Sequence, residues 1–266
     1  MAAEKRTKAK AGKHAKTGKI QEKRYEFLKT GVKGLDDLFE EGIPKSSSVL
    51  VSGGAGSGKT LLCLQIIYNA AMKGKKCFYM SFEESEDRLK SHMGKFGWSL
   101  GKNENNMRIK KFNLFDITRS IDALLAKQSG DLLIEVKPVL LPDDFRPDII
   151  VVDSLTAIAS AFSGKEGTYR LYIEQLFRFF EQQGVNTFLI SETEQNPSIY
   201  SPTGVEEFLA DGVIVLYNIR KGSVRENGLE VLKMRGTKHK KKIVAMQIIE
   251  GKGVEIYPEQ EVFGVE

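Results

Sequence analysis

The feature that most constrains how this chain can fold is the string GGAGSGKT, which occupies residues 53–60. It follows the apolar run SSVLVSG (47–53), and apolar residues at helical spacing follow it from Lys59 to about Met72. Glycines in such a string allow a tight loop between a strand and a helix, so that backbone N–H groups and the positive helix end converge on phosphate oxygens. The string therefore predicts a P-loop at the end of a central strand of an α/β fold.

The P-loop predicts that the chain binds ATP with Mg²⁺. We expect Lys59 to reach the β- and γ-phosphates. We expect the Thr60 hydroxyl to bind Mg²⁺, which keeps octahedral oxygen geometry and takes few protein ligands. The predicted nucleotide-binding residues are Gly53, Gly54, Ala55, Gly56, Ser57, Gly58, Lys59, Thr60 and Leu61. A glycine-rich turn with an incidental lysine is the alternative, and the strand before the string and the helix after it argue against that alternative.

Short apolar runs alternate with helical patterns along the rest of the chain, which indicates a mostly parallel central sheet flanked by helices. The predicted central strands are 47–53, 76–82, 148–154, 185–191 and 211–218. The first predicted helix covers about 59–72, the second begins near Glu84, and the third covers about 168–183. The C-terminal segments 229–236, 242–250 and 253–258 are expected to extend the sheet as antiparallel strands. Each motif occurs once, so we predict one domain over residues 25–266.

Asp153 ends an apolar strand, because it follows four consecutive aliphatic residues in the run DIIVVDS (148–154). A carboxylate in that place would be costly to bury without a partner, and a metal shell at the carboxyl end of a strand supplies one. We therefore predict that Asp153 and Thr60 together bind Mg²⁺. Asp148, at the start of the same run, is expected to be solvated.

Glu83 and Glu84 follow the run 76–82 and are candidates for the group that orients the attacking water in ATP hydrolysis. Neighbouring residues on an extended segment point to opposite sides, so we expect one to face the phosphate and the other to support it or to begin a helix. An ordinary acidic helix start is the alternative for Glu84. Glu83 is the preferred catalytic residue, and the chain is predicted to be a P-loop ATPase.

Positive charge is concentrated in the first 24 residues, which hold nine Lys or Arg against two Glu, a net charge of +7. Because the whole chain carries +5, the remaining 242 residues carry a net charge of about −2. Residues 1–24 contain almost nothing apolar and are expected to form a disordered tail. This tail could bring the protein to DNA without sequence preference, or it could be a solubilising extension with no partner.

Cysteine usage and hydropathy point to a cytoplasmic protein. Cys63 and Cys77 lie in apolar patterns without metal-ligand spacing, which predicts buried thiols in a reducing compartment. No run approaches the roughly 18 consecutive apolar residues that a membrane span needs, and no apolar signal-peptide core follows the basic N-terminus. We therefore expect no membrane association.

Several segments together resemble the KaiC branch of the RecA superfamily, and they occur in the order that this family shows. They are GVKGLDDLFEEGIPKSSSVLVSGGAGSGKT, FEES, VVDSLTAI, EEFLADGVIVL, KMRGTKH and EGKGVEIYP. The resemblance covers nearly all of the chain after the tail, and it is greatest to single-domain members that occur in archaea beside the RadA recombinases. It implies a RecA-like P-loop NTPase core.

The resemblance also implies roles for particular residues. It implies that Glu83 and Glu84 both serve hydrolysis. It implies that Lys233 and Arg235 reach across a subunit interface to the γ-phosphate of a neighbour's ATP, within a homo-oligomer that would be a hexameric ring. His239 matches a family histidine that lies near the sugar of the neighbour's nucleotide. Ser191 and Glu192 would lie where RecA-type proteins sense the γ-phosphate.

The chain departs from the family pattern in several places. Clock-type KaiC proteins carry two such domains and an autophosphorylation region, so circadian function is not implied, and autokinase activity stays open. Recombinases carry a helical DNA-binding domain and a polymerisation motif, so strand exchange is not expected. The segment 119–147 is longer than in the simplest template and could be an interface or substrate-contacting insertion.

Two functions remain open. The first is an ATPase whose hydrolysis drives or times a conformational change in a ring, and which could contact DNA through the tail, the loop 193–204 and the run 238–242. The second is a nucleotide-sensing adaptor, in which ATP binding assembles a platform for another protein with little hydrolysis. The complete set of candidate catalytic groups favours the ATPase, because groups positioned for a transition state would be superfluous in a ground-state binder.

Overall fold

The computed structural model describes residues 26–115, 117, 119, 139, 141–195 and 197–262 of the 266-residue chain. The predicted tail (1–24) and most of the predicted insertion (119–147) lie outside these residues. Their predicted roles are therefore not tested by the fold.

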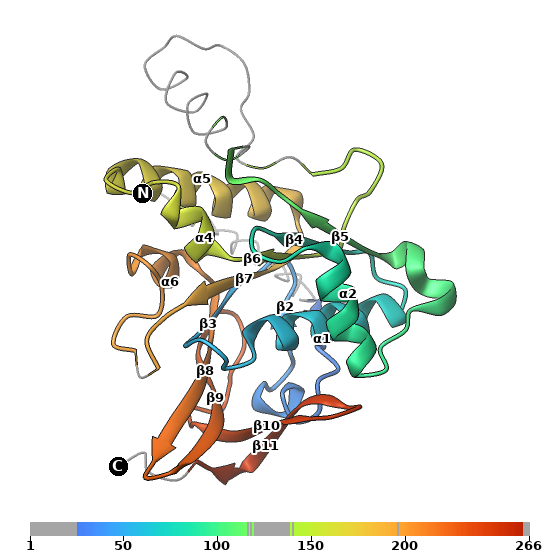
Figure 1. Ribbon diagram of the computed structural model, residues 1–266, viewed down its shortest axis with the longest axis vertical. Coiled ribbons are helices and arrows are strands. Elements are labelled where there is room, and N and C mark those ends of the chain that lie inside the picture. Colours follow the sequence, from blue (N-terminus) through green and yellow to red (C-terminus); the bar gives the residue numbers. More distant parts are fainter. Residues whose placement is uncertain are drawn as a thin grey trace, which may run out of the picture.

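The described residues form a nine-stranded sheet in the order β11-β10-β9-β8-β3-β7-β6-β4-β5 (Figure 1). The parallel part, from one side to the other, consists of β8 (Gly212–Lys221), β3 (Ser48–Gly53), β7 (Asn186–Glu192), β6 (Ile149–Asp153), β4 (Cys77–Ser81) and β5 (Met107–Lys111). The antiparallel extension consists of β9 (Val224–Met234), β10 (Val244–Ile249) and β11 (Gly253–Glu261). A separate antiparallel pair joins β1 (Phe27–Leu28) to β2 (Ile43–Pro44).

Helices cover both faces of the parallel part (Figure 1). The α-helices are α1 (Lys59–Met72), α2 (Glu86–Lys95), α4 (Leu155–Ser160), α5 (Glu166–Gln183) and α6 (Val205–Leu209), and the 3₁₀ helices are η1 (Asp36–Leu38) and η2 (Gly101–Asn106). Apolar residues of α1 and α2 belong to one core cluster, and those of α4 and α5 belong to the other. Strand β3 supplies both clusters, because Val49 and Val51 face the first and Leu50 faces the second. This burial on both faces explains why the central strands are continuous apolar runs.

The predicted fold class is confirmed: a mostly parallel sheet is flanked by helices and extended by antiparallel strands. Helix α1 has the predicted bounds. Helix α2 begins at Glu86, close to the predicted start near Glu84, because Ser85 caps it: the Ser85 hydroxyl accepts a hydrogen bond from the N–H of Arg88 at 3.4 Å. Helix α5 ends as predicted before Gly184, which has a φ of 66° in the left-handed region. The sequence did not predict the edge strand β5.

The sheet order brings four loops to one edge. Gly53 at the end of β3 pairs with Glu192 at the end of β7, and Ser81 at the end of β4 pairs with Asp153 at the end of β6. Parallel strands end at the same edge of a sheet, and ligands of open α/β sheets bind outside these carboxyl ends. The residues that follow these strands are therefore the first place to look for a functional site.

The structure also bears on the two cysteines and on membrane-spanning helices. Cys63 and Cys77 are free and buried, as the sequence predicted. None of the helices among the described residues is long and apolar enough to cross a membrane.

Candidate functional site

The P-loop connects β3 to α1, and its conformation depends on glycine. Gly56 and Gly58 have φ values of 74° and 98°, in the left-handed region that side chains disfavour. Lys59, the first residue of α1, is buried, and its Nζ donates a hydrogen bond to the Gly54 carbonyl oxygen at 3.0 Å. Burial lowers the pKa of Lys59, while the nearby carboxylates, Glu192 first, act in the opposite direction. An anion in the loop would therefore stabilise the charged form of this lysine.

Gln195, which follows β7, closes one side of the P-loop. Its Nε2 donates a hydrogen bond to the Ala55 carbonyl oxygen at 3.1 Å. A Cβ atom on residue 54 would lie 2.6 Å from the Gln195 side chain, so the end of that side chain would have to move for any other residue to fit there. The N–H of Thr193 also donates to the Gly53 carbonyl oxygen at 3.1 Å. The loop after β7 is thus attached directly to the P-loop.

Asp153 lies beside Thr60 at the carboxyl edge. Its Oδ2 accepts hydrogen bonds from Thr60 Oγ1, at 3.0 Å, and from the Tyr79 hydroxyl. Burial raises the pKa of Asp153 to about 6; the hydrogen bond from Tyr79 lowers it and the charge of Glu83 raises it further. A buried carboxylate with this pKa is stabilised by a cation, and the adjacent hydroxyl and carboxylate oxygens are ligands that Mg²⁺ prefers.

The remaining ligands of such an ion would not be protein carboxylates or imidazoles. Among the described residues, no group of three or more His, Cys, Asp or Glu side chains could hold a metal. Mg²⁺ at Thr60 and Asp153 would therefore complete its coordination with phosphate oxygens and water, as it does in nucleotide sites.

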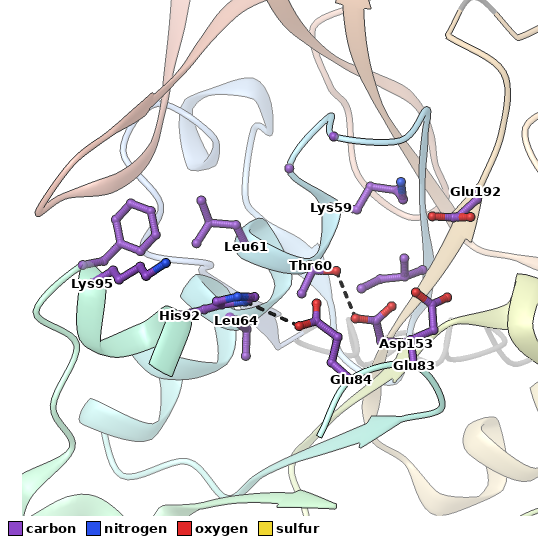
Figure 2. Close-up of a pocket in the computed structure, with 14 residues that line it drawn as sticks. Lys59, Thr60, Leu61, Leu64, Glu83, Glu84, His92, Lys95, Asp153 and Glu192 are labelled. Carbon is purple, nitrogen blue, oxygen red and sulfur yellow. Dashed lines mark hydrogen bonds and ion pairs between the residues drawn. The ribbon is translucent and has the colours of Figure 1, made fainter. Parts of the chain in front are cut away.

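Glu83 and Glu84 follow β4 and both face the cavity at this edge (Figure 2). Glu83 Oε1 accepts a hydrogen bond from the Ser154 hydroxyl. Glu84 Oε2 forms an ion pair with Arg88 Nε at 2.8 Å, one turn along α2. The Ser81 hydroxyl fixes the backbone here, because it accepts from the Glu84 N–H at 2.9 Å and donates to the Glu84 carbonyl at 2.7 Å. Both glutamates therefore reach the site, and each has its own partner.

The cavity has a volume of about 380 Å³ and collects most of the predicted site residues (Figure 2). Its lining consists of Gly56, Gly58, Lys59, Thr60, Leu61, Leu64, Glu83, Glu84, His92, Lys95, Phe96, Asp153, Ile190 and Glu192. The other P-loop residues, Gly53, Gly54, Ala55 and Ser57, belong to the same loop without lining the cavity. Glu192 faces the cavity, whereas Ser191 beside it is fully buried.

Lys233 and Arg235 lie away from this cavity, at the C-terminal end of α6. Lys233 Nζ donates to the carbonyl oxygens of Glu207 at 3.0 Å and Ala210 at 2.6 Å. Arg235 Nη2 donates to the Phe208 carbonyl at 3.1 Å. These carbonyls attract cations because a helix C-terminus carries partial negative charge. Neither cation lines the cavity that contains Glu83 and Glu84.

The sheet register shows how far these cations lie from the P-loop of their own chain. The N–H of Arg235 bonds to the Asp211 carbonyl, and the N–H of Asp211 bonds to the Ser48 carbonyl. Arg235 is therefore level with the start of β3, roughly 16 Å along the strand from Gly53 at about 3.3 Å per residue. His239 is also remote from the cavity, in a bridge to Phe39.

Sequence reasoning missed several residues of the site. Tyr79 and Ser154 contact predicted residues from strand positions that read only as apolar or small. Arg88, His92 and Lys95 follow Glu84 at helical spacing, and this i, i+4, i+7 pattern was the available signal. Gln195 lies in a loop, where no periodicity indicates which side chain turns inward.

Comparison with known proteins adds independent information. A family model described as "ATPase: KaiC" matches residues 28–261. The circadian clock oscillator protein KaiC of Parathermosynechococcus lividus is 31% identical over 234 residues, which are 86% of this chain and 42% of that protein. The circadian clock protein KaiC3 of Synechocystis sp. is 30% identical over 237 residues, 88% of this chain and 46% of that protein. The chain thus spans less than half the length of these relatives.

A solved structure is similar over its whole length. The crystal structure of a KaiC-like protein from the hyperthermophilic archaeon Pyrococcus horikoshii OT3 has a TM-score of 0.71 and 30% sequence identity. The similarity covers 88% of this chain and 100% of that chain.

Proposed function

The chain belongs to the KaiC family of ATPases in the RecA superfamily, and on this premise we propose that it binds ATP with Mg²⁺ in the cavity beside the P-loop and hydrolyses it there. One observation carries the proposal. The buried Lys59, the Thr60–Asp153 pair, and the carboxylates of Glu83 and Glu84 converge on one cavity from three different strand ends. This combination supplies phosphate binding, metal binding and a base in one place.

The P-loop would bind the triphosphate. Backbone N–H groups between Gly53 and Thr60 donate to phosphate oxygens at the positive end of α1. Lys59 would exchange its hydrogen bond with the Gly54 carbonyl for the β- and γ-phosphates. Thr60 and Asp153 would hold Mg²⁺, and this ion would neutralise negative charge on the phosphoryl group. Leu61 would close the cavity beside the phosphates.

Glu83 is the proposed catalytic base. It would accept a proton from the water that attacks the γ-phosphorus atom, so that the water oxygen forms the new P–O bond as the bond to ADP breaks. The Ser154 hydroxyl holds one carboxylate oxygen of Glu83, which leaves the other oxygen available to the water. The contacts of Glu84 with α2 favour a supporting role for that residue.

We propose a homo-oligomer because Lys233 and Arg235 are remote from the P-loop of their own chain. Cations in that position can stabilise the transferring phosphoryl group only of a neighbouring copy. They would have to leave the carbonyl oxygens at the end of α6 to do so. His239 would lie near the sugar of the same neighbour's nucleotide, in a ring that we propose to be hexameric.

DNA association, if it occurs, is proposed to depend on residues 1–24. Of the two other predicted contacts, the loop 193–204 and the run 238–242, the lysines of the run mostly form ion pairs with acidic residues. Lys238 Nζ lies 3.6 Å from Glu40, and Lys240 and Lys242 lie 2.8 and 3.8 Å from the Glu259 carboxylate. These pairs reduce the positive charge that the core could offer to a phosphate backbone.

The deciding experiment measures nucleotide binding and phosphate release by the full chain at millimolar Mg²⁺. We expect Lys59→Ala to abolish ATP binding, and Lys73→Ala, at the exposed end of the same helix, to leave it unchanged. Wild-type protein that binds ATP without releasing phosphate would indicate the nucleotide-sensing adaptor. ATP binding that survives in Lys59→Ala would show that the phosphate site lies elsewhere.

A further inference from the structure

Helix α2 carries a row of basic residues, Arg88, His92 and Lys95, of which His92 and Lys95 line the cavity and Arg88 borders it through its contact with Glu84. Leu89 and Met93 are buried in the core, and these contacts fix which side of the helix faces the sheet. Arg88 and His92, each one residue earlier, are then directed toward the loop that holds Glu83 and Glu84. His92 lines the cavity together with Lys95, one further turn along the helix (Figure 2). The row follows the i, i+4, i+7 spacing of one helical stripe.

This row contacts only one of the two adjacent glutamates. Glu84 Oε2 lies 2.8 Å from Arg88 Nε and 3.8 Å from His92 Nδ1. The side chain of Glu84 is 24% exposed and that of Arg88 is 69% exposed, so the carboxylate is partly shielded from water although its arginine partner is not. Glu83 accepts its hydrogen bond from the neutral Ser154 hydroxyl instead. The two carboxylates are therefore held by different elements, Glu84 by α2 and Glu83 by the residue that caps α4.

The negative charge of the cavity explains why holding Glu84 away from Glu83 would favour binding of a triphosphate. Glu83, Glu84, Asp153 and Glu192 all line the space into which an anionic triphosphate must fit. Asp153 can be neutralised by Mg²⁺ and Glu83 is needed for the reaction. An unpaired Glu84 would add repulsion on the γ-phosphate, which the cations of α2 reduce.

We propose that Arg88 and His92 are positioning residues that hold Glu84 against α2 and leave Glu83 as the carboxylate that faces the γ-phosphate. Arg88 makes the closer contact, and His92 adds a second ion pair when its ring is protonated. The inference rests on the proposed function of this cavity. By this inference, α2 contributes to both triphosphate affinity and hydrolysis by holding Glu84. Neither the P-loop nor Asp153 makes that contribution.

The test is a double-mutant cycle between Arg88 and Glu84. Affinities for a non-hydrolysable ATP analogue and for ADP, each with Mg²⁺, are measured together with kcat and KM. We expect Arg88→Gln to weaken analogue binding about threefold to tenfold, and ADP binding less, because the freed carboxylate repels the γ-phosphate most. We expect kcat to fall roughly tenfold. Both effects should disappear when Glu84→Gln is the background, since residue 84 then has no carboxylate for Arg88 to hold.

The chain offers a matched control on the same helix. Lys90 pairs with Glu86 at 2.8 Å with the same i, i+4 spacing, and neither residue lines the cavity. Lys90→Gln should therefore change helix stability as Arg88→Gln does and leave nucleotide affinity and kcat unchanged. Arg88→Lys should restore most of the loss, and His92→Gln should act in the same direction as Arg88→Gln with a smaller effect.

The outcomes separate this inference from the proposed function. An effect of Arg88→Gln that persists at full size in Glu84→Gln, or that Lys90→Gln reproduces, would overturn the positioning role. Analogue binding without hydrolysis by the wild type would contradict the ATPase proposal, and the affinity cycle would still decide the role of Arg88. A wild type that binds neither nucleotide would refute both.

Discussion

Replacing Asp153 with asparagine should stabilise the ligand-free protein while it removes a proposed metal ligand. Asp153 is 3% exposed, and burial raises its pKa from the ordinary value of 3.8 to about 6. Between these pH values the folded protein binds more protons than the unfolded chain, so the free energy of unfolding falls as the pH rises through this window. The stabilising contribution of the protonated carboxyl is therefore present below about pH 4 and is lost above about pH 6.

The expected change in the free energy of unfolding follows from the pKa shift of Asp153. A rise from 3.8 to about 6 corresponds to about 3 kcal/mol of unfolding free energy lost by neutral pH. Asparagine has nearly the same shape, stays neutral, and can still accept the hydrogen bonds from Thr60 and Tyr79. We expect Asp153→Asn to be about 2–3 kcal/mol more stable than wild type at about pH 7.5, which is a Tm rise of roughly 4–12 °C. At about pH 4 the two proteins should unfold alike.

The assay is urea unfolding and thermal unfolding in EDTA across this pH range. Asp148→Asn is the matched control, because Asp148 precedes the same strand and its side chain is 47% exposed. The order of stability should reverse with Mg²⁺ and ATP at about 1,000 times the wild-type Kd, because a ligand at that concentration stabilises the wild type by about 4.1 kcal/mol and we expect the variant to lose the metal. An Asp153→Asn variant without added stability in EDTA at about pH 7.5, or with the same gain at about pH 4, would refute the argument from burial.

Three further predictions concern the proposed reaction. Glu83→Gln should lower the rate of phosphate release about 100-fold or more with little change in ATP affinity, and a rate near that of wild type in a hydrolysis assay would show that another group acts as the base. Mixing Arg235→Ala subunits with Lys59→Ala subunits should recover part of the turnover that each lacks alone, because some interfaces then combine an intact P-loop with an intact arginine. No recovery would argue that Arg235 acts within its own chain. Deleting residues 1–24 should weaken any DNA binding and flatten its dependence on salt concentration in a fluorescence titration; unchanged binding would assign the contact to the core.

The sequence was informative where a local pattern determines the structure. The P-loop string, the apolar runs and the helix 59–72 lie where the fold has them, because each depends on residues that are close in the chain. Asp153 could be selected because a carboxylate after four aliphatic residues is unusual. The strand order then brings Glu83, Asp153 and Glu192 together, as expected for carboxyl ends of parallel strands.

The partners of these residues could not be predicted in the same way. Tyr79 reaches Asp153 because β4 and β6 are neighbours, and Ser154 reaches Glu83 for the same reason. These contacts join residues 74 and 71 positions apart, so no local spacing reveals them. The hydrogen bonds from Lys233 and Arg235 to carbonyl oxygens at the end of α6 could not be predicted either. They depend on where a five-residue helix ends.

The electrostatics of the cavity explain why a metal and a triphosphate should be needed together. Burial disfavours the charged form of Lys59 and also the charged form of Asp153, which have opposite signs. A nucleotide without its metal would meet the carboxylates of Glu83, Glu84 and Glu192, whereas a metal alone would leave the buried Lys59 without an anion beside it. A metal–triphosphate complex places a cation beside Asp153 and an anion beside Lys59, so each component offsets the cost that the other would incur. The charges of the cavity therefore favour the proposed metal–triphosphate complex over the triphosphate alone.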